Sequence, residues 1–106
     1  MDSTSDKIAM IVQSTAVPGK RDELFALYEQ HLVPRAEANE EQQVVVWVAD
    51  QHDDDRFFLF ELYANAESMG ANAQADWFFT YLQAAGPMLA GEPQVTMGNP
   101  RWSKGL

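Results

Sequence analysis

The sequence predicts an α+β protein with a ferredoxin-like antiparallel sheet, in which elements follow the order β-α-β-β-α-β and both helices cover one face. Three observations predict this class. Short β-branched or aromatic runs occur at 8–17, 44–49, 57–63 and 94–98. Two segments with helical period, which begin near Asp22 and Ala66, separate the first run from the second and the third from the fourth. An acidic loop joins the second run to the third, which favours an antiparallel hairpin.

Composition narrows the classes of function. The chain has 106 residues, and we expect residues 1–6 to form a flexible tail and residues 7–106 a single domain. Sixteen acidic and seven basic residues give a net charge of −9, which argues against binding to nucleic acid or to anionic membranes. The absence of cysteine excludes disulfides and thiolate catalysis. Without a membrane-length apolar run or a secretory leader, the expected location is the cytoplasm.

The first strand ends at Pro18-Gly19, and an amphipathic helix follows it. Its apolar stripe has helical spacing and consists of Leu24, Leu27, Tyr28 and His31. Pro34 lacks an amide hydrogen, so the helix should kink or end near residues 31–33. Residues 37–43 are then expected to form a polar connector.

The hairpin strands should have both faces covered, because residues 44–49 are apolar almost throughout. Alternation along the third strand places Phe57, Leu59, Glu61 and Tyr63 on one face and Phe58, Phe60 and Leu62 on the other. The face away from the helices is expected to carry residues such as Val45, Trp47 and Phe58. A second copy of the sheet is the simplest cover for such a face, so the sequence predicts a homodimer in the form of a dimeric α+β barrel.

The second helical segment begins after Asn65, a good N-cap residue, and a second start is expected at Asp76, whose carboxylate would cap a turn opening with Trp77. One stripe of this helix contains Trp77, Tyr81, Ala84 and Met88, and Phe78, Leu82 and Leu89 flank it. Gly86-Pro87 weakens the end of the helix. Residues 94–98 form a weak fourth strand.

Several short segments, taken in order, resemble the antibiotic biosynthesis monooxygenase family of small dimeric α+β barrels. The matching segments are Val17-Pro18-Gly19-Lys20, Leu32-Val33-Pro34-Arg35-Ala36-Glu37, Asp53-Asp54 before a Phe-rich strand that ends near Glu61, Asn65-Ala66-Glu67-Ser68, and Pro100-Arg101-Trp102-Ser103-Lys104-Gly105. The resemblance runs from about Lys7 to the end. Many relatives have histidines in the second helix where this chain has Asn72 and Trp77.

The resemblance implies a monooxygenase that oxidises an aromatic or phenolic small molecule, of quinol or polyketide type, with O2 and no bound cofactor. Such chemistry needs an apolar pocket, donors for a developing oxyanion and exclusion of water. Asn72 would donate to the oxyanion, Trp77 would supply a stacking wall and an indole N–H, and Tyr81 would be a donor or proton relay. The residues expected to line the pocket are Tyr28, His31, Glu61 and Phe78. An aromatic stripe of this kind is also typical of a plain core.

Glu61 and His31 carry the remaining alternatives. Glu61 lies in an apolar strand, so burial should raise its pKa and suit it to be a general base. Its structural alternative is a dimer or helix anchor paired with a buried cation such as Arg35 or Arg101. His31 could accept a proton or be a hydrogen-bonded core residue. The sequence therefore also allows a lyase or isomerase that uses either residue as base, and a non-catalytic ligand-binding or stress-related barrel.

The acidic loop around His52 invites a metal hypothesis. Asp50, Asp54 and Glu61 match positions in a calcium loop, but Asp55 stands where the turn needs glycine. A solvated hairpin tip is the better interpretation. Two isolated histidines and no cysteine argue against zinc or iron, so no metal site is expected.

Overall fold

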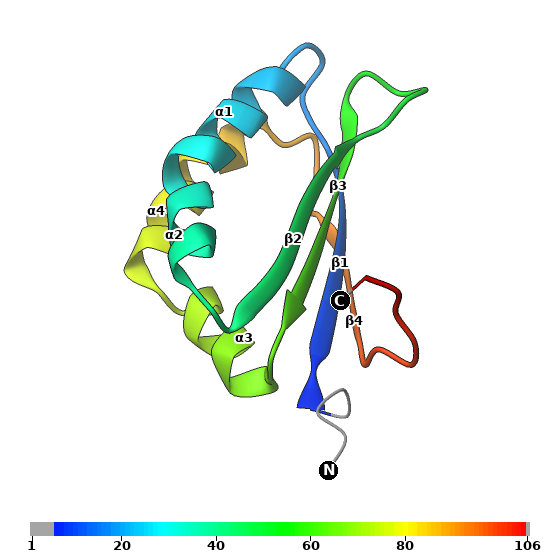
Figure 1. Cartoon of the computed structure of the whole chain (residues 1–106). Helices are drawn as coiled ribbons and strands as arrows, with labels where there is room; N and C mark the ends of the chain where they lie inside the picture. The colour runs from blue at the N-terminus through cyan, green and yellow to red at the C-terminus, as the bar shows by residue number, and fades with distance from the viewer. Residues whose placement is uncertain (1–5, 106) are drawn as a thin grey trace.

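The computed structural model describes residues 6–105, so the tail predicted for residues 1–6 lies outside this range except for Asp6. Four antiparallel strands form one sheet in the order β2-β3-β1-β4. Figure 1 shows the helices gathered on one face of this sheet. The strands are β1 (Ile8–Thr15), β2 (Gln42–Ala49), β3 (Arg56–Tyr63) and β4 (Gln94–Gly98). The ferredoxin-like α+β class predicted from the sequence is confirmed.

Each of the two predicted helical segments is divided into two helices. The bounds are α1 (Arg21–His31), α2 (Val33–Ala38), α3 (Ala66–Ala73) and α4 (Asp76–Ala85), followed by a 3-10 turn, η2 (Gly86–Met88). The break at Leu32 comes just before Pro34, as expected from its missing donor. The chain then continues as α2 into part of the predicted polar connector, which is therefore shorter than expected.

The helix starts are partly as predicted. Asn65 caps α3, and its side-chain oxygen accepts a hydrogen bond from the Ser68 amide at 2.8 Å. The cap predicted at Asp76 is wrong. Ala75 is the N-cap of α4 and Asp76 is its first residue, where the carboxylate still lies near the positive end of the helix dipole.

The strand register corrects the predicted open face. Val45 pairs with Glu61, and Trp47 pairs with Leu59, so Val45 and Trp47 share the face of Glu61 because cross-strand partners point the same way. This is the helix-covered face, since Trp47 stacks on the buried Phe57 ring with centroids 4.7 Å apart. The prediction that Val45 and Trp47 face away from the helices is therefore wrong, whereas Phe58, paired with the exposed Val48, does lie on the open face.

The core between helices and sheet is small and lies toward the end of the sheet that carries the hairpin loop. Its buried members are Ala16, Leu24, Phe57 and Ala85, with Leu27, Trp47, Tyr81, Met88 and Leu89 packed around them. At the other end of the same layer the buried side chains are Glu61 and Tyr63. The interior therefore changes from apolar to polar along β3. Within residues 6–105, no helix is long and apolar enough to cross a membrane.

Candidate functional site

The polar end of the interior contains four side chains joined by hydrogen bonds, which we call the Glu61 cluster: Gln42, Glu61, Tyr63 and Asn72. Glu61 Oε1 accepts from Tyr63 OH at 2.6 Å and from Gln42 Nε2 at 2.5 Å. Asn72 Nδ2 donates to Tyr63 OH at 3.3 Å and to Gln42 Oε1 at 3.4 Å. Strands β2 and β3 and helix α3 thus meet around one carboxyl group.

A β-bulge aims Gln42 into this cluster. Gln42 pairs with Tyr63 and Val44 pairs with Leu62, so Gln43 is an extra residue in β2. Simple alternation would have placed Gln43 on the helix-covered face. Instead Gln43 is exposed and its side chain accepts from Lys7 Nζ at 2.7 Å. Gln42 and Tyr63 are members of the site that sequence reasoning missed, and the bulge explains the first omission.

Two further tyrosines, which we call the tyrosine pair, face Glu61 from the helices: Tyr28 of α1 and Tyr81 of α4. Their rings meet edge to face with centroids 6.1 Å apart. The ring of His31 of α1 also lies near this pair, with its centroid 6.4 Å from the Tyr81 centroid. Phe78 of α4 also stacks on the Tyr81 ring. The structure therefore brings together six of the seven residues predicted for the site: Tyr28, His31, Glu61, Asn72, Phe78 and Tyr81.

Burial controls the electrostatics of the cluster. Loss of hydration raises the pKa of Glu61, and the hydrogen bonds from Tyr63 and Gln42 oppose this by stabilising the carboxylate. Burial also raises the pKa of Tyr81 to about 12, with a smaller contribution from the Glu61 charge. The same two causes, in the same order, raise the pKa values of Tyr28 and Tyr63. The direction expected for the pKa of Glu61 from the sequence is confirmed.

The hydrogen-bonding capacity of the site is not used up. Glu61 is only 6% exposed, yet both of its donors bind Oε1. Among residues 6–105, Oε2 and the hydroxyls of the tyrosine pair have no hydrogen-bond partner, and no fully buried side-chain atom in this part of the chain lacks one. These three oxygens are therefore still reached by water. A carboxylate oxygen that belongs to a largely buried side chain and has no protein donor is a natural acceptor for a ligand.

Trp77, the seventh predicted site residue, lies farther from the Glu61 cluster. The Arg35 guanidinium lies over the Trp77 ring, 5.4 Å from its centroid. Phe78 contacts Trp77 on one side and stacks on Tyr81 on the other, with centroids 6.4 and 6.3 Å away. Among the ring contacts of residues 6–105, Phe78 therefore connects Trp77 to Tyr81.

Within the single chain, neither cation named as an anchor for Glu61 pairs with it. Arg35 lies on Trp77 rather than on Glu61, and Arg101 is exposed in the C-terminal segment. In the described part of the chain, the ion pairs are Lys20 with Glu23 and Arg56 with Asp50. Neutral donors, not a cation, hold Glu61.

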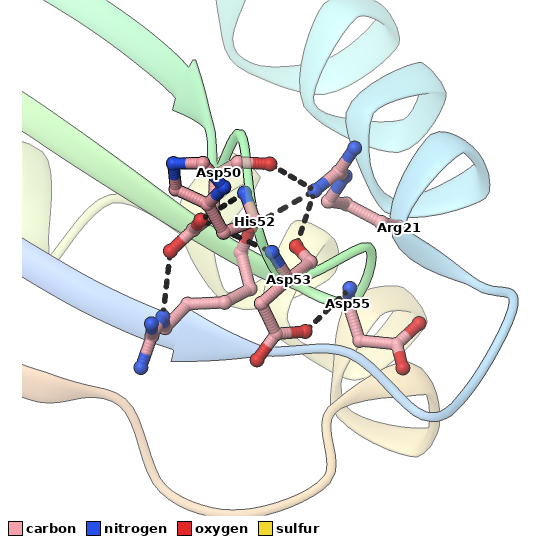
Figure 2. Close-up of polar contacts among 6 residues, drawn as sticks. Arg21, Asp50, His52, Asp53 and Asp55 are labelled. Carbon is pink, nitrogen blue, oxygen red and sulfur yellow. Dashed lines mark hydrogen bonds and ion pairs between the residues drawn. The ribbon is translucent and has the colours of Figure 1, made fainter.

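The acidic hairpin loop, residues 50–55, is ordered by its own backbone and by Arg21 (Figure 2). Asp50 Oδ1 accepts from the amides of His52 and Asp53, and Oδ2 accepts from Arg56 Nε at 2.8 Å. Arg21 Nη1 donates to the carbonyls of Asp50, Asp53 and Arg56. Nowhere in residues 6–105 are three His, Cys, Asp or Glu side chains arranged to hold a metal ion. This loop is a structural element.

Two surface hollows lie outside the Glu61 cluster. One, of about 430 Å³, adjoins the acidic hairpin loop and is lined by Gly19, Arg21, Asp22, Asp54 and Asp55. The other, of about 650 Å³, lies at the opposite end of the sheet and includes Lys7, Gln43, Asn65 and Asn99 among its lining residues. Neither contains a buried unpaired acceptor, so we locate the candidate site by chemistry, at the Glu61 cluster.

The fold and this interior define a ferredoxin-like α+β protein whose sheet and helices enclose a polar site. Solved structures share the fold. Two are called "putative antibiotic biosynthesis monooxygenase": one from Caulobacter crescentus CB15 (21% identity, 92% of each chain, TM-score 0.83) and one from Nitrosomonas europaea (13% identity, 95% of this chain and 96% of that one, TM-score 0.85). A third, with the same description, is from Chloroflexus aurantiacus J-10-fl (22% identity, 93% and 97%, TM-score 0.76).

The chain therefore shares its fold with structures that carry this description, in agreement with the resemblance seen in the sequence. No protein-family model and no curated protein sequence matches it. At these identities the likeness concerns the fold, and fold alone does not determine activity.

Proposed function

We propose that the chain is a cofactor-independent monooxygenase that oxidises an aromatic or phenolic small molecule, of quinol or polyketide type, with O2 at the Glu61 cluster. The observation that carries this proposal is the unpaired Oε2 of a buried carboxyl group, next to the tyrosine pair. The likeness in fold to structures called antibiotic biosynthesis monooxygenases supports the reaction class.

The reaction begins with loss of the phenol proton to Glu61 Oε2. The electron-rich phenolate then gives electrons to O2, and a ring carbon forms a bond to oxygen. In the balanced reaction a ring C–H and the phenol O–H become two carbonyls. One oxygen atom enters the product, the other leaves as water, and the substrate supplies all four electrons. Asn72 and Tyr81 act as donors to the oxyanion that develops.

Oxygen consumption tests this proposal. Purified protein, dialysed against chelator, is incubated with hydroquinones, naphthols and anthrone-type substrates in an oxygen electrode, and isotopically labelled O2 traces the atoms. We expect one labelled oxygen in the product and one in water, with no hydrogen peroxide. Lys20→Ala, an exposed change far from Glu61, is the control for unaffected turnover. No protein-dependent oxygen uptake with any of these substrates would contradict the proposal.

A lyase or isomerase is the second candidate, because an unpaired buried carboxylate with a raised pKa also suits proton abstraction next to a carbonyl group. Such a reaction needs no O2. Product formed equally fast in air and under argon would favour this candidate. If Tyr81→Phe and Glu61→Gln leave every measured activity unchanged, a non-catalytic ligand-binding barrel is the better account.

We also propose that the protein is a homodimer joined through the open face of the sheet. Exposed apolar residues gather there: Ile11, Val46 and Val48 are 49%, 46% and 42% exposed. Val46 and Ile11 flank Phe60 in one row across the sheet, and Val48 pairs with Phe58 in the next. A flat apolar face of this kind is costly in water, and an identical face is its natural partner.

Sedimentation tests the dimer. We expect the wild-type chain to sediment at twice its monomer mass, and Val46→Lys to sediment as a monomer, because the new charge would be buried in the interface. Phe79→Lys is the matched control, since Phe79 is 51% exposed but belongs to helix α4. A monomeric wild type, or dissociation by the Phe79 variant alone, would contradict this interface.

A further inference from the structure

The charge of the Glu61 site restricts which substrates can bind there. This inference takes from the proposed function that the substrate is a phenol or enol, and it does not depend on a reaction with O2. Glu61 is buried, its Oε1 is occupied by two donors, and its Oε2 is unpaired. The titratable groups that face it are Tyr63 on its own strand, Tyr28 from α1 and Tyr81 from α4.

In the part of the chain that the structure describes, no cation pairs with this carboxylate. The neighbours from β2 and α3 are the neutral amides of Gln42 and Asn72. Neither ion pair recorded in residues 6–105 involves Glu61. His31 lies near Tyr81. Within residues 6–105, it makes no hydrogen bond to the Glu61 carboxylate. The site therefore carries at most one negative charge, held by neutral donors on a side chain that is only 6% exposed.

A second negative charge in this site is strongly disfavoured. Two like charges at contact distance repel much more when water is excluded. Burial first and the charge on Glu61 second raise the pKa of each of the three tyrosine hydroxyls, and the second cause has the direction that this repulsion predicts. A ligand that enters as a phenolate, carboxylate or phosphate would meet the same repulsion. A neutral phenol or enol instead donates its proton toward Oε2 and keeps the total charge unchanged.

We infer that the Glu61 site selects a neutral, hydrogen-bond-donating phenol or enol and, at neutral pH and above, holds a single proton between Glu61 Oε2 and the substrate oxygen. When the substrate ionises, the O–H bond breaks and the same proton forms a bond to Oε2, so no charge enters or leaves the site. Carboxylated and phosphorylated aromatics are excluded by this arrangement. Gln42 and Tyr63 are positioning residues that direct the free oxygen toward the ligand.

Proton counting by calorimetry tests the inference. Para-nitrophenol is titrated into the wild-type protein in two buffers of different ionisation enthalpy, at a series of pH values. As the pH rises above the pKa values of the free phenol and free Glu61, we expect the uptake to approach one proton per ligand bound, and the affinity to fall about tenfold per pH unit. The yellow phenolate colour should fade on binding.

The Glu61→Gln variant is the matched control. A glutamine keeps an oxygen for Gln42 and Tyr63 and places an N–H where Oε2 was, so it should bind the phenolate without proton uptake and with its colour kept. Para-nitrobenzoate, an anion of similar size, should bind this variant more tightly than the wild type. A melting curve checks the fold of the variant, and the proton count of the wild type decides the inference if the variant does not fold.

Binding of phenolate by the wild type without proton uptake would overturn the inference, as would equal uptake by the Gln variant or failure to bind any neutral phenol. These outcomes are separate from those of the oxygen experiment. Proton uptake without oxygen consumption would leave the ligand class standing and remove the oxygenase. Oxygen consumption without proton uptake would support the oxygenase and remove the inferred selection for a neutral ligand.

Discussion

The Glu61 cluster and the acidic hairpin loop are both rich in acidic and amide groups, but they differ in how their hydrogen-bonding capacity is used. In the loop, both oxygens of Asp50 accept hydrogen bonds, and Arg21 caps three backbone carbonyls. In the cluster, Gln42 and Tyr63 both donate to Oε1 of Glu61, and Oε2 has no donor. The loop is denser in acidic residues, yet the cluster has the capacity to bind a ligand. Unused capacity in a buried group, rather than acidic density, distinguishes a site from a structural motif here.

The largest expected effect follows from removing the free acceptor. Glu61→Gln should lower turnover by about 10²–10⁴-fold, because general base catalysis contributes roughly this much. The matched change in the loop, Asp53→Asn, should leave the turnover of the folded protein within about twofold, since it lies outside the reacting groups. Steady-state kinetics on folded fractions measure both. Near-normal turnover in the Gln variant would place the chemistry elsewhere.

The next effect should fall on stability and in the other region. Arg21→Ala removes one charged donor from three carbonyls, and we expect it to lower the free energy of unfolding by about 1.5–3 kcal/mol. Turnover of the folded variant should not change. Lys20→Ala is the control, because its exposed pair with Glu23 is worth less than about 1 kcal/mol. Urea titrations measure both, and a large loss of turnover at unchanged stability in the Arg21 variant would refute the structural role of the loop.

Removing the Tyr63 hydroxyl should have a smaller effect, on the pH profile. The hydrogen bond from Tyr63 lowers the pKa of Glu61, so Tyr63→Phe should move the acid limb of the kcat/KM profile to higher pH. A bond of this kind is worth about 1 kcal/mol, which corresponds to a shift of less than about one pH unit. Tyr81→Phe is the comparison, because no hydrogen bond joins Tyr81 to Glu61 in the described residues. Equal shifts in both variants would contradict the geometry of the cluster.

The smallest effect concerns the pH dependence of stability, which should have opposite signs in the two regions. Burial raises the pKa of Glu61, so the native state binds more protons than the unfolded state above a pH of about 4.3, and this contribution to stability is lost as the pH rises through the folded-state pKa. Bonds from the His52 amide and Arg56 lower the pKa of Asp50, so its contribution is lost as the pH falls.

Melting curves across pH measure both contributions. The stability of Glu61→Gln relative to the wild type should increase as the pH is raised from about 4 and then level off. The advantage of the wild type over Asp50→Asn should shrink as the pH is lowered below the range in which aspartate normally ionises. Parallel trends in the two variants would show that one of these carboxyl environments is misassigned.

Regular patterns made the fold predictable from the sequence. Period-two and period-3.6 spacing located all four strands and both helical segments, and the missing donor of Pro34 predicted the break after α1. The same patterns placed Glu61 and Tyr28 facing the interior, where the structure has them. Sequence alone also anticipated the raised pKa of Glu61, because a carboxyl group in an apolar strand is desolvated.

The errors arose where geometry depends on pairing between distant residues. The bulge at Gln43 turns the Gln42 side chain into the site. Nothing in the local sequence of glutamines and valines predicts this bulge. The sequence does not show which face of the sheet Trp47 occupies, because polar and apolar residues do not alternate in a strand that is apolar on both faces. The cation expected on Glu61 was replaced by Tyr63 and Gln42, whose approach depends on that same register.

Carbon-13 NMR of the carboxyl groups tests the central claim most directly, because it observes both regions in one sample. Protein labelled at the side-chain carboxyls of Glu and Asp is titrated with a neutral phenol at constant pH. We predict that the Glu61 resonance shifts as the site saturates, because Oε2 gains a hydrogen-bond donor, while the resonances of Asp50, Asp53 and Asp55 stay in place. An unmoved Glu61 resonance at saturation, or movement confined to the loop aspartates, would contradict the assignment of the site.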